Sequence, residues 1–107
     1  MAELKDILIE LQNKFNADPA GVGGLNATYL FDLTGDQAAQ FHVVFANGKA
    51  VVNDGGADDA NITVIMDADD FKAVAGGQLN AMAAFMSGKL KVQGDIMLAM
   101  KLQSLLG

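Results

Sequence analysis

His42 is the only histidine in the 107-residue chain, and histidine is the side chain that exchanges protons most readily near neutral pH. It lies in an alternating run, with Phe41 and Val43 on either side. Because successive side chains of a strand point to opposite faces, His42 falls on the face opposite these apolar neighbours. We predict an ordinary strand histidine that meets solvent, with a role in proton transfer as the alternative.

Acidic and amide side chains cluster at two places. The first cluster consists of Asn53, Asp54, Asp58 and Asp59. It lacks the alternating ligand positions and the closing glutamate of a calcium loop, so we predict a solvated turn there. The second cluster consists of Asp67, Asp69 and Asp70, at the start of a helical pattern. Acids at this place cap the first turn of the helix and complement the helix dipole. We predict no metal site and no catalytic residue, and the absence of cysteine excludes thiolate chemistry.

The glycine-rich segment 21–24 is the remaining candidate for a cofactor loop. It follows a helical pattern and precedes a strand pattern, whereas a phosphate-binding loop must lead from a strand into a helix N-terminus. No cofactor is therefore predicted.

Methionine and phenylalanine are abundant, with six of each in the chain. Four methionines are concentrated near the C-terminal end: Met82, Met86, Met97 and Met100. Methionine adapts to irregular shapes at little strain, which suits a pocket for apolar ligands of different outline. Ordinary core filling explains the same residues, and composition alone leaves both interpretations open.

Hydrophobic periodicity and turn residues divide the chain into helices and strands. The first helix ends before Asp18-Pro19, and Asn47-Gly48 forms a type I′ turn between two antiparallel strands. The expected helices cover residues 4–15, 67–76, 79–88 and 95–106, with Asp67 and Asp95 as N-caps, and the expected strands cover residues 27–33, 41–45, 49–53, 62–66 and 89–93.

This order predicts one α+β domain over residues 1–107 with a mainly antiparallel sheet. The final helix is apolar around nearly its whole circumference, so it needs apolar contacts on several sides. Hydrophobic residues make up 51% and charged residues 19% of the chain, which is enough apolar surface for a real core.

The net charge of −6 makes nucleic acid an unsuitable partner and limits contact with an anionic bilayer to a transient one through a local apolar or lysine-bearing patch. No signal peptide or membrane-spanning run is visible, and Leu105-Leu106-Gly107 does not match the peroxisomal Ser-Lys-Leu address. A cytoplasmic location is the default expectation.

The run from Ala84 to Asp95, AFMSGKLKVQGD, strongly resembles the sterol carrier protein type 2 family, together with Asp69-Asp70-Phe71 and Gly77-Gln78-Leu79. The rest of the chain agrees at lower specificity. The resemblance implies a five-stranded, mainly antiparallel sheet with helices packed on one face around a hydrophobic tunnel. It also implies a lipid ligand, such as a fatty acid, a fatty acyl-CoA or a sterol.

We expect apolar side chains of the sheet's inner face and of the later helices to line this tunnel. The predicted lining residues are Phe31, Leu33, Val43, Phe71, Met82, Phe85, Met86, Met97, Met100 and Leu105. When the tunnel is empty, the inner face of the final helix loses apolar contacts. We therefore predict that this helix, from Asp95 onward, acts as a mobile gate. The chain is then a monomeric, non-enzymatic lipid carrier.

Two other functions stay open. One is a small enzyme in which His42, at the tunnel mouth, transfers a proton on a bound steroid or acyl thioester. The other is a protein-interaction module whose final helix docks into a partner.

Overall fold

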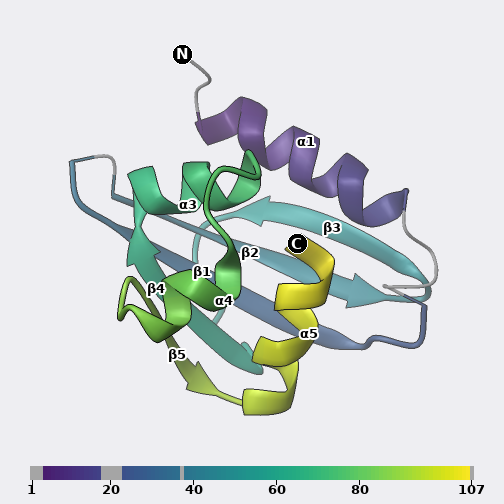
Figure 1. The fold of residues 1–107 in the computed structure, drawn as a ribbon. Coiled ribbons are helices and arrows are strands. Elements are labelled where there is room, and N and C mark those ends of the chain that lie inside the picture. Colours follow the sequence, from purple (N-terminus) through teal and green to yellow (C-terminus); the bar gives the residue numbers. More distant parts are fainter. Residues whose placement is uncertain (1–3, 18–22, 37, 107) are drawn as a thin grey trace.

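The computed structural model describes residues 4–17, 23–36 and 38–106, and their side chains for residues 5–17, 23–36 and 38–102. Figure 1 shows the helices α1 (Leu4–Asn16), α3 (Ala68–Ala75), α4 (Ala81–Met86) and α5 (Ile96–Leu106). The strands are β1 (Ala27–Thr34), β2 (Ala39–Ala46), β3 (Lys49–Asp54), β4 (Ile62–Asp67) and β5 (Leu90–Gly94). The predicted α+β class is confirmed, while Asp18-Pro19 and most of the glycine-rich segment lie outside the described residues.

The five strands form one sheet in the order β3-β2-β1-β4-β5. Three neighbouring pairs are antiparallel, as predicted, and β1 with β4 is the one parallel pair. After β3 the chain leaves that edge of the sheet, and β4 then pairs with the far side of β1. This crossover makes the sheet mixed, and no local sequence signal indicated it.

The turn between β2 and β3 has the predicted geometry. Asn47 and Gly48 both have positive φ, at 56° and 75°, as a type I′ turn requires at its two central positions. The twist of this turn matches that of the flanking strands, so Ala46 pairs directly with Lys49.

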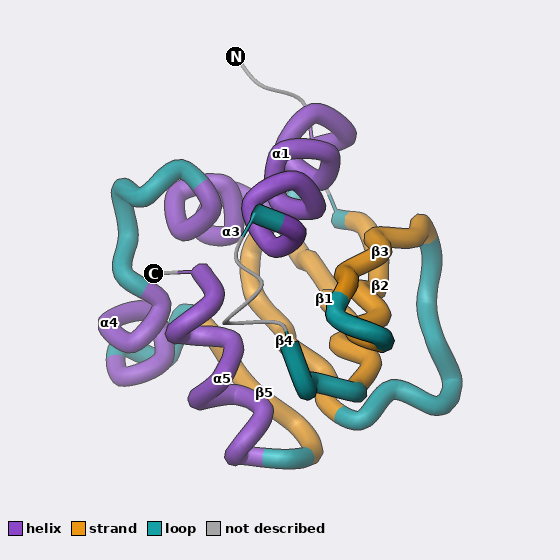
Figure 2. The backbone as a smooth tube through the Cα atoms, turned by 90° about the vertical axis from the view of Figure 1, so that its right-hand side faces the viewer, coloured by secondary structure: helices purple, strands orange, loops and turns teal. Residues whose placement is uncertain are grey.

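The four described helices lie on one side of the sheet (Figure 2). Alternate residues of β1, β2 and β4 are therefore buried against the helices, while the residues between them are half-buried on the other face. His42 is one of the half-buried residues of β2, as the alternation predicted.

Helix α1 closes the outer edge of the sheet by hydrogen bonding to β3. The Gln12 side-chain oxygen accepts from the Val52 amide at 2.8 Å. Asn16 accepts from the Ala50 amide at 2.8 Å and donates to the Ala50 carbonyl oxygen at 3.0 Å. An open strand edge invites pairing with another chain, and these bonds occupy it at Ala50 and Val52.

Three short polar side chains begin the last three helices. Asp67 accepts from the Asp69 amide at 2.8 Å and Asp95 accepts from the Met97 amide at 2.9 Å, so both predicted N-caps are confirmed. Asn80 caps α4 by accepting from the Met82 amide at 2.8 Å, which places Leu79 before the helix rather than in it.

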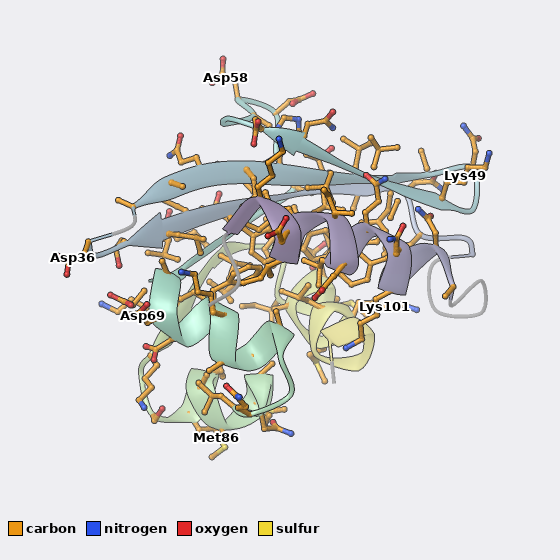
Figure 3. The ribbon with its side chains drawn as sticks, turned by 90° about the horizontal axis from the view of Figure 1, so that it is seen from above. Asp36, Lys49, Asp58, Asp69, Met86 and Lys101 are labelled. Carbon is orange, nitrogen blue, oxygen red and sulfur yellow. The ribbon has the colours of Figure 1, made fainter. Side chains whose placement is uncertain are left out.

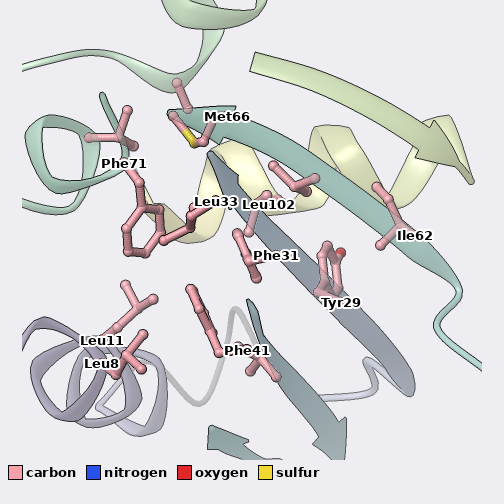
Figure 4. Packing of buried hydrophobic residues seen from close by; sticks show 14 of the residues in the cluster. Leu8, Leu11, Tyr29, Phe31, Leu33, Phe41, Ile62, Met66, Phe71 and Leu102 are labelled. Atoms are coloured by element: carbon pink, nitrogen blue, oxygen red, sulfur yellow. The ribbon is translucent and has the colours of Figure 1, made fainter. Parts of the chain in front are cut away.

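Aromatic side chains fill the centre of the space between sheet and helices (Figure 4). Phe31 stacks on Phe41 with ring centroids 4.7 Å apart, and Phe71 of α3 tilts against both at 5.8 and 5.3 Å. The Phe45 ring lies 5.2 Å from Tyr29 and 5.3 Å from Phe15 of α1. In this part of the interior, rings from the sheet and from two helices contact one another.

Replacement of Gly94 at the end of β5 tests the close approach between this strand and β4. Gly94 has φ +114°, and a Cβ there would lie 2.6 Å from the Asn61 carbonyl oxygen. We expect Gly94→Ala to lower the free energy of unfolding by about 3 kcal/mol, from backbone strain and the overlap together. The measurement is urea denaturation.

Gly55 supplies the matched control. It also has positive φ, at +89°, but nothing lies within 4 Å of a Cβ built on it. Gly55→Ala is therefore expected to lower the free energy of unfolding by about 1 kcal/mol, from backbone strain alone. Equal losses for the two variants would mean that the contact with Asn61 has no energetic consequence.

Candidate ligand pocket

An apolar pocket of about 260 Å³ is lined by residues of α4, β5 and α5. Strand β5 forms the edge of the sheet opposite β3, and Figure 1 shows α4 and α5 at that end. Every residue in the pocket lining is apolar: Ala81, Met82, Phe85, Leu90, Val92, Ile96, Ala99, Met100 and Leu102. A surface of this kind attracts the hydrocarbon part of a ligand and offers no side chain for acid-base chemistry.

Local structure explains why these side chains converge. Met82 and Phe85 are three residues apart and so share one face of α4, and Asn80 fixes where that helix begins. Leu90 and Val92 alternate onto the inner face of β5, as the partners of Met66 and Val64. On α5, Ala99 and Met100 lie three and four residues after Ile96, and Leu102 lies three residues after Ala99.

The pocket reaches the surface of the molecule. Its inner wall includes the buried Leu90 and Leu102, whereas Phe85 is 49% and Met100 is 63% exposed. Large apolar side chains left in water at the rim of a hollow mark a site that something apolar covers.

A buried hydrogen bond ties α5 to the sheet. The Tyr29 hydroxyl donates to the Leu98 carbonyl oxygen at 2.7 Å, and the Tyr29 side chain is otherwise enclosed in the core. Burial raises the pKa of the Tyr29 hydroxyl above its ordinary value, and the charge of Asp95 raises it further. The hydroxyl therefore stays protonated at neutral pH and donates this bond throughout the physiological range.

Of the ten residues predicted from the sequence to contact lipid, three line this pocket: Met82, Phe85 and Met100. Met86 and Met97 belong to the same helices but are 79% and 76% exposed, and they lie outside the lining. The side chain of Leu105 falls outside the described residues.

The other four predicted residues lie in the buried hydrophobic core: Phe31, Leu33, Val43 and Phe71. Each is 1% exposed or less, and Figure 4 shows Phe31, Leu33 and Phe71 packed among other buried side chains. None of the four lines the pocket, and whether they contact a lipid stays a prediction.

Six lining residues were absent from the sequence-based prediction: Ala81, Leu90, Val92, Ile96, Ala99 and Leu102. The predicted period of two in the last strand already placed Leu90 and Val92 on one face. Ala81 and Ala99 carried no signal, because a small side chain lines a hollow only where its larger neighbours leave space.

His42 does not take part in this pocket, because it points to the opposite face of the sheet. Its Nδ1 lies 2.9 Å from the Gly55 carbonyl oxygen, an atom that can only accept, so Nδ1 carries the proton in this contact. Across the described residues, no three acidic or histidine side chains come close enough together to hold a metal ion.

A second hollow of about 540 Å³ lies between α1 and α3, with charged and apolar walls mixed. Glu10, Lys14 and Lys72 contribute to its lining. Charged walls hold water well, so this hollow is less suited to a hydrocarbon chain than the pocket beside β5.

The fold and the pocket define a small ligand-binding domain, with a five-stranded mixed sheet, helices on one face and an apolar hollow open to the surface. The chain belongs to the SCP-2 sterol transfer family, whose model matches residues 8–107. The resemblance noted in the sequence is thereby confirmed.

Curated relatives carry this domain as part of longer chains. The chain is 36% identical over 101 residues to sterol carrier protein 2 of Homo sapiens, a match that covers 94% of this chain and 18% of that protein. It is 39% identical over 80 residues to hydroxysteroid dehydrogenase-like protein 2 of Xenopus tropicalis, covering 74% of this chain and 19% of the relative. The chain thus spans about a fifth of the length of these curated relatives.

Solved structures share the fold. The apo form of sterol carrier protein 2 from Yarrowia lipolytica is 25% identical, with a TM-score of 0.74 over 94% of this chain and 87% of that one. The palmitated SCP2L2 of Aedes aegypti is 23% identical, with a TM-score of 0.84 over 98% and 95% of the two chains. Among the residues that the structure describes, no helix is both long and apolar enough to cross a membrane.

Proposed function

We propose that this chain is a non-enzymatic, monomeric carrier that holds the hydrocarbon part of one lipid molecule in the pocket between α4, β5 and α5. The observation that carries the proposal is a surface-accessible hollow whose lining is apolar throughout. Membership of a sterol transfer family supports a lipid as the ligand.

The size of the pocket bears on how a lipid is held. About 260 Å³ is just below the range of about 300–1,000 Å³ that ligand pockets usually span. The hollow as it stands accepts part of a long acyl tail, and a complete tail requires α5 to move away from α4. Each methylene removed from water contributes about 0.8 kcal/mol, which is about fourfold in affinity.

The lining also bears on selectivity. With no hydrogen-bonding side chain among its residues, the pocket discriminates by length and bulk rather than by polar groups. Fatty acids, fatty acyl-CoA esters and sterols therefore remain the candidate classes. The palmitated state of the Aedes aegypti relative favours a fatty acyl chain.

Extraction of the purified protein with organic solvent, followed by lipid identification, tests the proposal. We expect one lipid per monomer, with native mass spectrometry showing the same complex intact. Titration of the delipidated protein with saturated fatty acids should then give an affinity that rises about fourfold per methylene and levels off once the pocket is filled. Recovery of no lipid together with an affinity independent of chain length would refute lipid carriage.

A further inference from the structure

Four methionine side chains on α4 and α5 are exposed to solvent, with exposed fractions from 39% to 79%: Met82, Met86, Met97 and Met100. In Figure 3 the sulfur atom of Met86 points away from the molecule. Met66, the other methionine whose side chain the structure describes, is 3% exposed and lies among buried side chains (Figure 4). The chain has no cysteine, so its sulfur chemistry is that of thioethers. Hydrogen peroxide in solution therefore reaches the four thioethers of α4 and α5 before that of Met66.

Two of these four methionines border the pocket. Met82 lines it from α4 and Met100 lines it from α5, whereas Met86 and Met97 belong to the same helices but lie outside the lining. We call Met82 and Met100 the lining pair, and Met86 and Met97 the outer pair. A soluble oxidant reaches both pairs, while a ligand that fills the pocket contacts the lining pair.

We propose that the lining pair is a modification site, at which oxidation by hydrogen peroxide lowers the affinity of the pocket for an acyl tail. This inference rests on the proposed lipid carriage. In the reaction the thioether sulfur attacks one peroxide oxygen: a sulfur–oxygen bond forms, the O–O bond breaks and one molecule of water leaves. The sulfur gives up two electrons to the peroxide, and methionine becomes methionine sulfoxide. Methionine sulfoxide reductases reverse this change, so the loss of affinity is reversible.

A sulfoxide is poorly suited to the lining because its oxygen needs a hydrogen-bond donor. Water supplies that donor in the empty pocket, but an acyl tail displaces the water, and no side chain of the lining donates a hydrogen bond. The backbone amide of Met82 is already engaged by the Asn80 side chain. Lipid binding then desolvates a polar group, and we expect about tenfold weaker binding for each oxidised lining methionine. Sulfoxides of the outer pair stay in water and do not weaken binding.

Two double variants separate the contributions of the two pairs. Met86→Leu with Met97→Leu leaves the lining pair oxidisable, and Met82→Leu with Met100→Leu leaves the outer pair oxidisable. Leucine is an apolar replacement of similar volume without sulfur. Each delipidated variant is titrated with palmitate before and after treatment with hydrogen peroxide. We expect treatment to weaken binding by about tenfold or more in the first variant, and to leave the second variant equal to its own untreated sample.

Equal losses in the two variants, or no loss in the first, would overturn the inference. Peptide mass spectrometry identifies which methionines have gained an oxygen atom. A loss of affinity that appears only once Met66 is oxidised would place the effect in the core, and so would also overturn it. Treatment of the oxidised protein with methionine sulfoxide reductases A and B should restore its affinity for palmitate.

The rate of oxidation provides a second measurement on the unsubstituted protein. Bound palmitate should slow oxidation of Met82 and Met100 severalfold, because the tail covers them, and should leave the rates at Met86 and Met97 unchanged. Equal slowing of both pairs would mean that the tail does not lie against the lining, which contradicts the inference.

Lipid binding by the untreated protein separates this inference from the proposed function. Normal palmitate binding that persists after complete oxidation of the lining pair overturns the inference and leaves lipid carriage standing. An untreated protein that yields no lipid on extraction and binds no fatty acid on titration overturns the carriage and, with it, the inference.

Discussion

Met100→Asp is expected to weaken fatty-acid binding by about thirtyfold to a hundredfold, equivalent to about 2–3 kcal/mol. Met100 lines the pocket from α5, so the new carboxylate would lie against the acyl tail and lose part of its hydration when lipid binds. The loss is smaller than for a fully buried charge because Met100 is 63% exposed. For the same reason the free energy of unfolding of the lipid-free protein should change by no more than about 0.5 kcal/mol.

Met97→Asp is the matched control for that experiment. It adds the same charge to the same helix at a residue that is 76% exposed and outside the pocket lining. Fatty-acid affinity in solution, measured by displacement of a fluorescent analogue, should fall much further for Met100→Asp. If both variants lose affinity equally, the effect is one of net charge and the tail does not occupy this pocket.

Lipid binding is expected to slow amide hydrogen exchange in α5 by about a hundredfold or more, while the amides of β1 and β2 change little. An unfilled pocket of about 260 Å³, at about 24 cal/mol per Å³, forfeits up to about 6 kcal/mol of packing. A ligand that restores even half of this packing free energy makes opening of α5 about a hundredfold rarer. Equal protection of α5 with and without lipid would contradict the prediction that α5 acts as a gate.

We expect α5 to move because few groups hold the part of it whose side chains the structure describes, residues 96–102. Leu102 is its one fully buried side chain within the described part, Leu98 and Ala99 are half-buried, and the Tyr29 hydroxyl bonds its backbone. Tyr29→Phe removes a hydrogen bond worth about 1 kcal/mol, so α5 amides should exchange about fivefold faster in the lipid-free protein. The exchange of the β2–β3 hairpin serves as the internal reference.

Most local features of the fold were predictable because nearest neighbours along the chain determine them. The alternation around Phe41 and Val43 identified a strand and the face on which His42 lies. Asn47-Gly48 identified a turn that needs two positive φ angles, and Asp67 and Asp95 identified helix starts by their capping oxygens. Each signal depends on a few adjacent residues and survives whatever the rest of the chain does.

Those local signals did not predict which strands pair when they are far apart in the sequence. The parallel contact of β1 with β4 joins segments about thirty residues apart, and antiparallel or parallel pairing uses the same alternation of side chains. Gln12 and Asn16 fit the polar side of an amphipathic helix, and their bonds to the edge of β3 exist only because α1 packs beside that strand.

The location of the pocket depended on packing in the same way. The sequence by itself established that the chain has an apolar inner sheet face and two methionine-rich helices, because composition and period are local properties. Whether a given apolar side chain fills the interior or borders a hollow was decided by tertiary structure: Phe31 and Phe71 meet other rings and close the core, whereas Phe85 and Met100 border the same hollow beside β5. The physical reason is that a void belongs to no single residue and appears only where helices and sheet fail to meet.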